Sequence, residues 1–493
     1  MKTPFEWRSC YINFAEHLLN AYNPNMLYPS LPYRWSDEDW FQFIDMIGFF
    51  GFNIFEFWLT PRLFSPAGHK EPFGEDFARQ MRAVIRHAAT RHVRIKMITA
   101  LSTVGEDWHT HCPNDPTEWS ECLQLWEAWT KRLPGLGVVG IFPGDPGGCS
   151  RNGCTARTYI AKSLEVAAVI HRNLPDAEIE LGTWGPPFFG WGNIRGAPDW
   201  KGDFVPAMQG TAWAFDKARA EDAMAYLIEK LPSFPDRTCV AINLGFNSDS
   251  NPEGGGGAED ARPWAREIAK LRPITTWDFS LTEGENAIIP HYRFARLFAQ
   301  RKRELEAAPY SGGICFTMTP MLNQLSLFQS AQSFLDPAAD HRQLTHRFYT
   351  MLFGPSAAAL ADLLPLFEIM PDWGNYTSLD VSRHELHRSM HEGMELLDAL
   401  AGHEDAQVPF HPSIVHHRRD LRFYFELFHE LSGDRPDFDG LCKRYWRRVY
   451  GIYDKLPAHV DPRPRFATER LIHFFDPAGD RARYGKWPAR WAQ

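Results

Sequence analysis

The chain has 493 residues, more than a single hydrophobic core usually supports, so we expect two domains. Apolar residues make up 44% and charged residues 23%, as in globular proteins with a large core, and the net charge of −9 argues against nucleic acid and anionic membrane surfaces as partners. No segment approaches the roughly 20 apolar residues of a transmembrane helix. The absence of a signal-peptide pattern at residues 1–7 and the eight scattered cysteines lead us to expect a cytoplasmic protein with reduced thiols.

Short apolar runs alternate with amphipathic stretches over the first two-thirds of the chain. The runs predict strands at residues 10–14, 53–58, 93–101, 137–142, 177–183, 239–244, 274–280 and 312–317. The amphipathic stretches predict helices at residues 37–50, 74–91, 117–133, 155–173, 216–231, 261–271 and 292–308. This alternation predicts an α/β fold of the (β/α)8 TIM-barrel type. A doubly wound sheet is the rival, but no Gly-x-Gly-x-x-Gly turn follows the first strand.

The strand pattern ends near residue 335, and helical periodicity follows. It predicts helices at residues 341–353, 356–370, 381–401, 413–431 and 438–456. We therefore expect a catalytic barrel over residues 1–334 and an all-α C-terminal domain over residues 335–493.

Two aspartates follow predicted strands, at the end of a barrel where active sites lie. Asp145 stands between Gly144 and Pro146 after the fourth strand, which is a constrained turn with open space beside it. Asp278 ends an apolar strand-like run in the seventh strand, where β-propensity disfavours an acid. We predict Asp145 as general acid or acid/base and Asp278 as nucleophile or base. The alternatives are a turn former or helix cap for Asp145 and a hydrogen-bond anchor for Asp278.

Other carboxylates, indoles and amides follow the same strands and suit the binding of sugars, with 18 tryptophans in the chain. The predicted substrate-binding residues are Glu56, Trp58, Trp184, Trp277, Glu283, Glu285 and Asn243. Trp184 and Trp277 are candidates for the apolar wall that keeps one carboxyl protonated. Glu283 and Glu285 compete with Asp278 for its role, and Glu56 could instead form a salt bridge with Arg62.

Thiols and imidazoles form a second group on two neighbouring loops. Cys149 and Cys154 follow the fourth strand, and His109, His111 and Cys112 follow the third. Because adjacent barrel loops meet, we expect the two groups on one side of the barrel mouth. A zinc site and a Cys149–Cys154 disulfide are open alternatives, although Cys-x4-Cys is looser than the usual Cys-x2-Cys. We expect free thiols and no metal or other cofactor.

Two segments resemble known glycosidases. Residues 37–59, with Trp40, Asp45 and a Gly-Phe-Phe-Gly-Phe-Asn run before a strand, resemble the first βα unit of barrel glycosidases such as β-hexosaminidases and xylan α-glucuronidases. Residues 323–354 resemble the barrel exit of the α-glucuronidases, where a helical domain follows. This superfamily-level resemblance implies the fold and glycoside chemistry. It carries over no catalytic pair, because hexosaminidases have paired Asp-Glu where this chain has Asp145-Pro146.

The sequence thus predicts a glycoside hydrolase that cleaves a glycosidic bond with two carboxylates and has a carbohydrate as its partner. The rivals are a zinc-dependent sugar hydrolase or lyase that uses the Cys/His loops, and a non-catalytic barrel that binds glycans. Homo-oligomerisation is left open.

Overall fold

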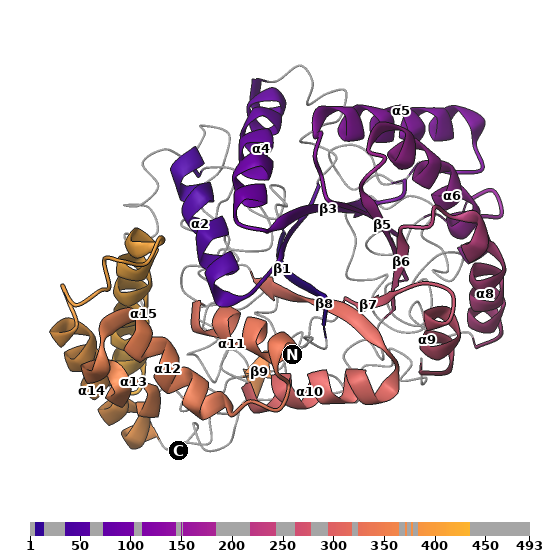
Figure 1. Ribbon diagram of the computed structural model, residues 1–493. Helices are drawn as coiled ribbons and strands as arrows, with labels where there is room; N and C mark the ends of the chain where they lie inside the picture. Colours follow the sequence, from indigo (N-terminus) through magenta and orange to yellow (C-terminus); the bar gives the residue numbers. More distant parts are fainter. Residues whose placement is uncertain are drawn as a thin grey trace. The chain divides into compact units, whose positions relative to one another are not determined.

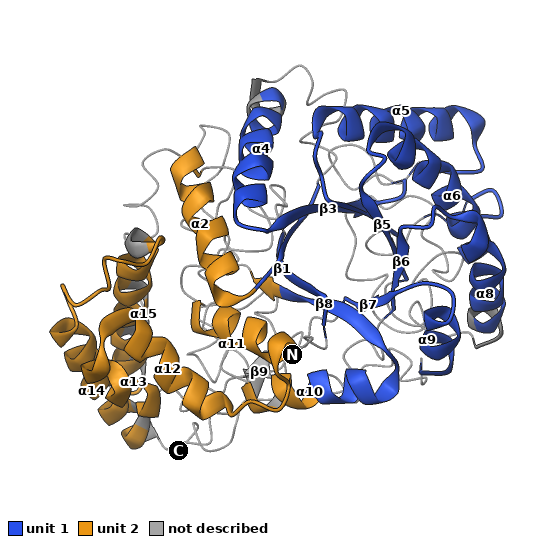
Figure 2. Ribbon diagram, viewed as in Figure 1, with its two compact units in different colours: residues 1–15, 52–280, 300–315 blue, residues 16–51, 281–299, 316–493 orange. Residues whose placement is uncertain are grey.

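The structure is a computed structural model of the whole chain. It describes residues 5–13, 35–59, 72–102, 111–143, 149, 151–183, 217–242, 262–277, 294–317, 324–363, 370–371, 376–377 and 383–433. The chain divides into two compact units, which Figure 2 shows in different colours. Unit 1 comprises residues 1–15, 52–280 and 300–315, and unit 2 comprises residues 16–51, 281–299 and 316–493. The domain boundary expected at residue 335 stays a prediction.

Eight parallel strands form a closed barrel in which each strand pairs with the next along the chain (Figure 1). They are β1 (Trp7–Asn13), β2 (Ile54–Trp58), β3 (Arg94–Ala100), β4 (Val138–Phe142), β5 (Glu178–Gly182), β6 (Thr238–Ala241), β7 (Ile274–Thr276) and β8 (Tyr310–Thr317). The predicted (β/α)8 fold is confirmed, and every predicted strand overlaps an observed one. The strands could be predicted from apolar runs because barrel strands are buried on both faces.

Helices alternate with the strands, and all of them except α11 were predicted from the sequence. They are α2 (Asp37–Phe50), α4 (Pro72–Thr90), α5 (Pro116–Arg132), α6 (Ala156–Asn173), α8 (Lys217–Lys230), α9 (Arg262–Ala269), α10 (Phe294–Ala307) and α11 (Gln324–Leu335). Within unit 1, α4, α5, α6, α8 and α9 lie outside the ring of strands (Figure 1). Local signals fix several of the ends: Asp115 accepts hydrogen bonds from the first backbone amides of α5, and Gly51 ends α2 at φ 112°.

The helix that follows β8, α11, was not predicted from periodicity, because half of its residues are polar. Four of these six polar side chains are nevertheless buried, and several of the six are hydrogen-bonded. Gln329 donates to the carbonyl of His341 at 2.7 Å, and Gln332 donates to the carbonyl of Phe50 at 2.9 Å. Hydrogen-bonded amides take the place of apolar side chains on the packed face of this helix. The apolar periodicity that predicts a helix from sequence is therefore weak here.

The N-terminal end of the barrel interior is an apolar layer. Trp7, Ile54, Val138 and Cys239 form one buried cluster there. Gly312 lets β8 approach β1, because a Cβ at this position would lie 2.2 Å from the Cβ of Trp7 and 2.5 Å from its carbonyl oxygen. The closing seam of the barrel therefore depends on a residue without a side chain.

The described residues of unit 2 after residue 323 are mainly helical. Its further helices are α12 (His341–Phe353), α13 (Ala358–Leu363), α14 (Arg383–Ala399) and α15 (His411–Leu431), and it also holds an antiparallel pair, β9 (Met370–Pro371) with β10 (Tyr376–Thr377). The sequence did not predict this pair. The ring of Phe50 packs edge-on against Phe328, Phe348 and Phe410, with ring centroids 5.5–5.9 Å apart, which joins α2, α11 and α12 in one core. The helix predicted at residues 438–456 lies outside the described residues.

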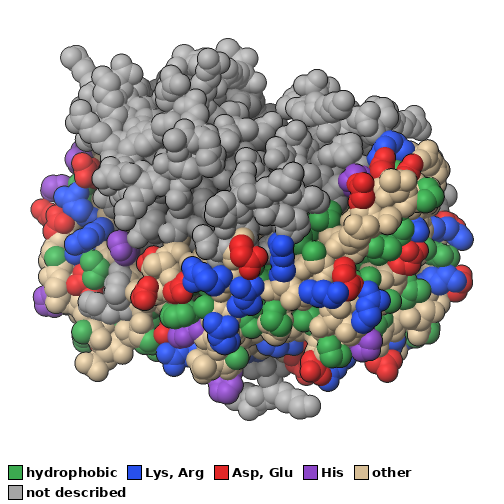
Figure 3. All heavy atoms as spheres, turned by 90° about the horizontal axis from the view of Figure 1, so that it is seen from above, with side chains coloured by type: hydrophobic (Ala, Val, Ile, Leu, Met, Phe, Trp, Pro, Cys, Tyr) green, Lys and Arg blue, Asp and Glu red, His purple; other side chains and the backbone are tan. Residues whose placement is uncertain are grey.

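The described surface carries charges of both signs. On the face seen in Figure 3, Lys and Arg side chains are interspersed with Asp and Glu. Several of them pair across helices, as Arg172 does with Glu127 at 2.6 Å. None of the described helices combines the length and the apolar character needed to span a bilayer.

Candidate functional site

The C-terminal end of the barrel, where the active site was expected, is described up to the last residues of its strands. Of the predicted site residues, the structure describes Glu56, Trp58 and Trp277, all in unit 1. The predicted catalytic and substrate-binding residues outside the described part of the chain are Asp145, Asp278, Trp184, Asn243, Glu283 and Glu285. His109, of the thiol and imidazole group, also lies outside it. The assignments to these residues stay predictions.

Glu56 lies inside the barrel and is fully buried. Its Oε2 is 2.8 Å from the Nζ of Lys96, which projects inward from β3. Its Oε1 accepts a hydrogen bond of 2.8 Å from the indole nitrogen of Trp277, at the end of β7. Glu56 thus forms an ion pair with Lys96, whereas Arg62, the partner weighed from the sequence, lies outside the described residues.

A second carboxylate completes this buried cluster. Glu180 on β5 places Oε2 2.5 Å from the Nζ of Lys96, and its Oε1 accepts a hydrogen bond of 2.7 Å from the hydroxyl of Thr275. All four side chains are at most 2% exposed. We call Glu56, Lys96, Glu180 and Thr275 the charged layer of the barrel.

The charged layer holds one more carboxylate than ammonium, and this sets its protonation. Burial raises the pKa of Glu56 to about 6, against the opposing pull of Lys96. Burial disfavours the charged form of Lys96, but Glu180 and Glu56 outweigh it, so the pKa of Lys96 is raised. The ammonium of Lys96 therefore stays charged, and the carboxylate of Glu56 takes up a proton in mild acid.

Four aromatic side chains lie on the C-terminal side of the charged layer. Trp277 is the central one, with ring centroids 5.2 Å from Tyr11, 5.2 Å from Phe142 and 6.4 Å from Trp58. Gly182 accommodates the ring of Phe142, since a Cβ there would lie 2.6 Å from Cδ1 of that ring. We call Tyr11, Trp58, Phe142 and Trp277 the aromatic layer; its tilted rings hold one another in place.

Sequence reasoning found two members of the aromatic layer and only Glu56 of the charged layer. It missed Lys96 and Glu180, which are recognisable as charges inside two largely apolar strands, where the only other charge is the first residue of each strand. In β3 the run is Arg-Ile-Lys-Met-Ile-Thr-Ala, and in β5 it is Glu-Ile-Glu-Leu-Gly. Opposite charges inside nearby barrel strands predict a buried ion pair, because a charge is rarely buried without a partner.

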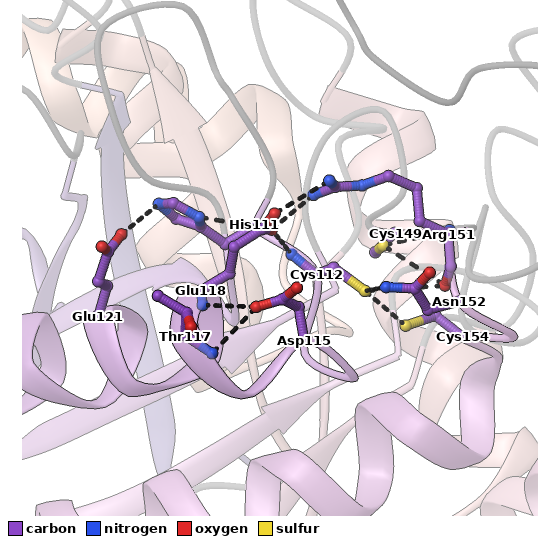
Figure 4. Close-up of polar contacts among 10 residues, drawn as sticks. All are labelled: His111, Cys112, Asp115, Thr117, Glu118, Glu121, Cys149, Arg151, Asn152 and Cys154. Carbon is purple, nitrogen blue, oxygen red and sulfur yellow. Dashed lines mark hydrogen bonds and ion pairs between the residues drawn. The ribbon is translucent and has the colours of Figure 1, made fainter.

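Three thiols meet beside the barrel (Figure 4). The Sγ atoms of Cys112, Cys149 and Cys154 all lie within 4.8 Å of one another, and those of Cys112 and Cys154 are 3.6 Å apart. Cys112 precedes α5, whereas Cys149 and Cys154 precede α6. The expected meeting of the loops after β3 and β4 is confirmed for these residues, and no disulfide joins them.

Charged groups surround the three thiols without joining them. Arg151 forms a two-pronged ion pair with Glu118, at 3.1 and 2.6 Å, and the backbone amide of Cys112 donates to the same carboxylate. The imidazole of His111 points to Glu118 and Glu121, at 3.5 and 3.4 Å (Figure 4). His111 is thus next to Cys112 in sequence but does not face the sulfurs.

The thiols differ in acidity. A hydrogen bond from Cys154 lowers the pKa of Cys149 to about 6 and raises the pKa of Cys154. Of these two thiols, Cys149 therefore loses its proton first.

Comparisons with known proteins bear on the fold. No protein-family model matches the sequence, and no curated protein matches it. Among solved structures, an O-GlcNAc hydrolase mutant from Thermobaculum terrenum has a TM-score of 0.51 at 13% identity, over 96% of this chain and 94% of that chain. A GH138 enzyme targeting pectin rhamnogalacturonan II has a TM-score of 0.50 at 10% identity, over 92% of this chain and 62% of that chain. The superfamily-level resemblance to barrel glycoside hydrolases is confirmed as a likeness of fold, which is what identities this low can show.

Proposed function

We propose that the protein is a glycoside hydrolase whose carboxyl pair is Asp145 and Asp278. The observation that carries the proposal is the contact between Phe142 and Trp277, with ring centroids 5.2 Å apart inside the barrel. Asp278 follows Trp277 directly and Asp145 follows Phe142 by three residues. Since each residue extends the chain by at most about 3.6 Å, the two acids are tethered to strand ends that meet.

The proposed chemistry needs one protonated and one ionised carboxyl. Asp145 protonates the glycosidic oxygen as it leaves, and Asp278 either attacks the anomeric carbon or activates a water molecule. A retaining enzyme holds its carboxyls roughly 5 Å apart and an inverting enzyme roughly 6.5–9.5 Å apart. Both separations are compatible with two acids that lie one and three residues beyond strand ends in contact.

The aromatic layer supports a carbohydrate as substrate, because it gives the barrel mouth a rigid apolar base. Flat rings suit the C–H faces of a sugar. Within this proposal Trp184 stacks on the sugar, while Asn243, Glu283 and Glu285 bind its hydroxyl groups. Trp58 and Trp277, both 2% exposed, form part of the apolar base of the barrel mouth and so shape the site. Glu56 orients Trp277 through its hydrogen bond.

The test uses the full-length chain on a panel of aryl glycosides and plant and microbial oligosaccharides. Asp145→Asn and Asp278→Asn should each lower kcat by on the order of 10²–10⁴ with little change in the melting temperature. Asp236→Asn is the control, because its carboxylate is fully exposed and it precedes β6, at the opposite end of that strand from the proposed site. Variants that keep full activity would remove the pair from the mechanism.

The same panel separates the rivals. Sugar binding without hydrolysis by the wild type indicates a glycan-binding barrel. Hydrolysis that is lost with a chelator and is insensitive to Asp145→Asn indicates the zinc-dependent enzyme.

A further inference from the structure

We propose that Cys112, Cys149 and Cys154 bind a zinc ion that ties the segment before α5 to the segment before α6. This site is separate from the proposed glycosidic chemistry. All three side chains are buried, at 0%, 4% and 2% exposure, and no disulfide joins them.

The spacing of the sulfurs fits a shared ion. Zinc–sulfur bonds of about 2.3 Å in a tetrahedron set the ligand sulfurs roughly 3.8 Å apart. The Sγ atoms of Cys112 and Cys154 are 3.6 Å apart, and all three sulfurs fall within 4.8 Å. A disulfide would bring one pair to about 2.0 Å and leave the third thiol without a function.

The backbone brings the second and third ligands together despite their wide sequence spacing. Asn152 and Gly153 have φ values of 48° and 69°, so the chain reverses between Cys149 and Cys154. The turn is closed by a 2.9 Å hydrogen bond from the amide of Cys154 to the carbonyl of Arg151. This turn brings the two cysteines close together, as a Cys-x2-Cys knuckle does with fewer residues.

Hydrogen-bond donors point at the sulfurs, as they do around metal-bound thiolates. The backbone amide of Arg151 donates to the Sγ of Cys149 at 3.3 Å. The side-chain amide of Asn152 donates to the Sγ of Cys112 at 3.5 Å, which links the two segments directly (Figure 4). Two donors from one turn therefore reach ligands on both segments.

Thiolates are soft ligands, which select zinc or Cu(I) over magnesium and calcium. We assign zinc, because it needs no change of oxidation state in a site whose purpose is to join two segments. The described residues supply three ligands, and a water molecule takes the fourth position. His111 does not supply it, because both of its ring nitrogens face Glu118 and Glu121.

The experiment measures metal content in the full-length chain, purified in reducing buffer without chelator after growth with added zinc. We expect one zinc per chain in the wild type and loss of that zinc in both Cys112→Ser and Cys154→Ser. Cys122→Ser is the matched control, because Cys122 is equally buried on α5 but is not part of the group. A strong chelator should lower the melting temperature of the wild type and of Cys122→Ser, and not that of the zinc-free variants.

Cobalt replacement keeps the proposal testable if the serine variants fail to fold. The reduced wild type titrated with Co²⁺ should develop sulfur-to-cobalt charge-transfer absorption that saturates at one equivalent. No such absorption, copper as the only bound metal, or a disulfide between Cys112 and Cys154 in the protein as isolated would overturn the assignment. These readouts do not involve hydrolysis, so their outcome does not depend on the proposed function.

Discussion

The indole nitrogen of Trp277 donates a 2.8 Å hydrogen bond to Glu56, which lies 221 residues earlier in the chain and on a different strand of the barrel. The bond joins the aromatic layer to the charged layer. Because Trp277 contacts three other rings of the aromatic layer, its orientation sets theirs. The base of the barrel mouth is therefore positioned by a carboxylate that is itself buried.

Replacing Trp277 with Phe should test this link. The variant keeps an aromatic ring but removes the donor, so a buried carboxylate loses a hydrogen bond worth roughly 1.5–3 kcal/mol. We expect a fall of that size in the free energy of unfolding in urea. Trp119→Phe is the control, because the Trp119 indole also donates to a carboxylate, Glu165, but to one that is 46% exposed. Equal losses in both variants would show that burial adds nothing to the link.

In the described barrel interior, Lys96 forms ion pairs with two buried carboxylates. Lys96→Met leaves Glu56 and Glu180 facing each other without compensation, and removal of one partner of a buried pair costs about 3–5 kcal/mol. We expect a loss in that range from denaturant unfolding. Arg94→Met is the comparison on the same strand, where the pair with Glu178 is about one-third exposed and worth roughly 0–1 kcal/mol. A loss for Lys96→Met no larger than that for Arg94→Met would contradict the charged layer as a stabilising unit.

Glu56 predicts a pH dependence of stability. Its pKa in the folded chain, about 6, lies above the ordinary value of 4.5, so the folded chain retains a proton that the unfolded chain releases. The contribution of Glu56 to the free energy of unfolding is complete below pH 4.5 and is lost as the pH rises through about 6. Wild-type stability should therefore fall by about 2 kcal/mol relative to Glu56→Gln across this window. Urea midpoints at a series of pH values measure the difference, with Glu178→Gln as the control for removing a carboxylate near the surface.

Gly182 predicts a steric effect on the aromatic layer. In Gly182→Ala the new Cβ would meet the ring of Phe142 at 2.6 Å, and overpacking of this kind costs about 1–3 kcal/mol. The double variant Gly182→Ala/Phe142→Leu should recover part of the loss, since the smaller side chain leaves room. Strictly additive losses in the double-mutant cycle would mean that the two positions do not press on each other.

The fold was accessible from the sequence because barrel strands are continuous apolar runs and barrel helices have one apolar face. The residues that escaped prediction break those rules. Lys96 and Glu180 are charges in buried strands, and their meaning depends on pairing between strands distant in sequence. Gln329 and Gln332 are amides on a buried helix, and only their partners reveal why the helix is stable. The sequence around Asp145 and Asp278 follows no periodic pattern, so the roles predicted for these two residues rest only on their position after the predicted strands.

The tight fit of Gly312 against Trp7 has a consequence for how this chain is made. The seam it closes joins the first strand to the eighth, so β1 waits for its second neighbour while roughly 300 further residues are translated. At about 5–20 residues per second, that wait lasts from about 15 seconds to a minute. During this time the nascent chain exposes an unpaired strand edge, which is a template for association with other chains. Ribosome-bound intermediates of this protein should therefore bind chaperones until Gly312 has left the exit tunnel.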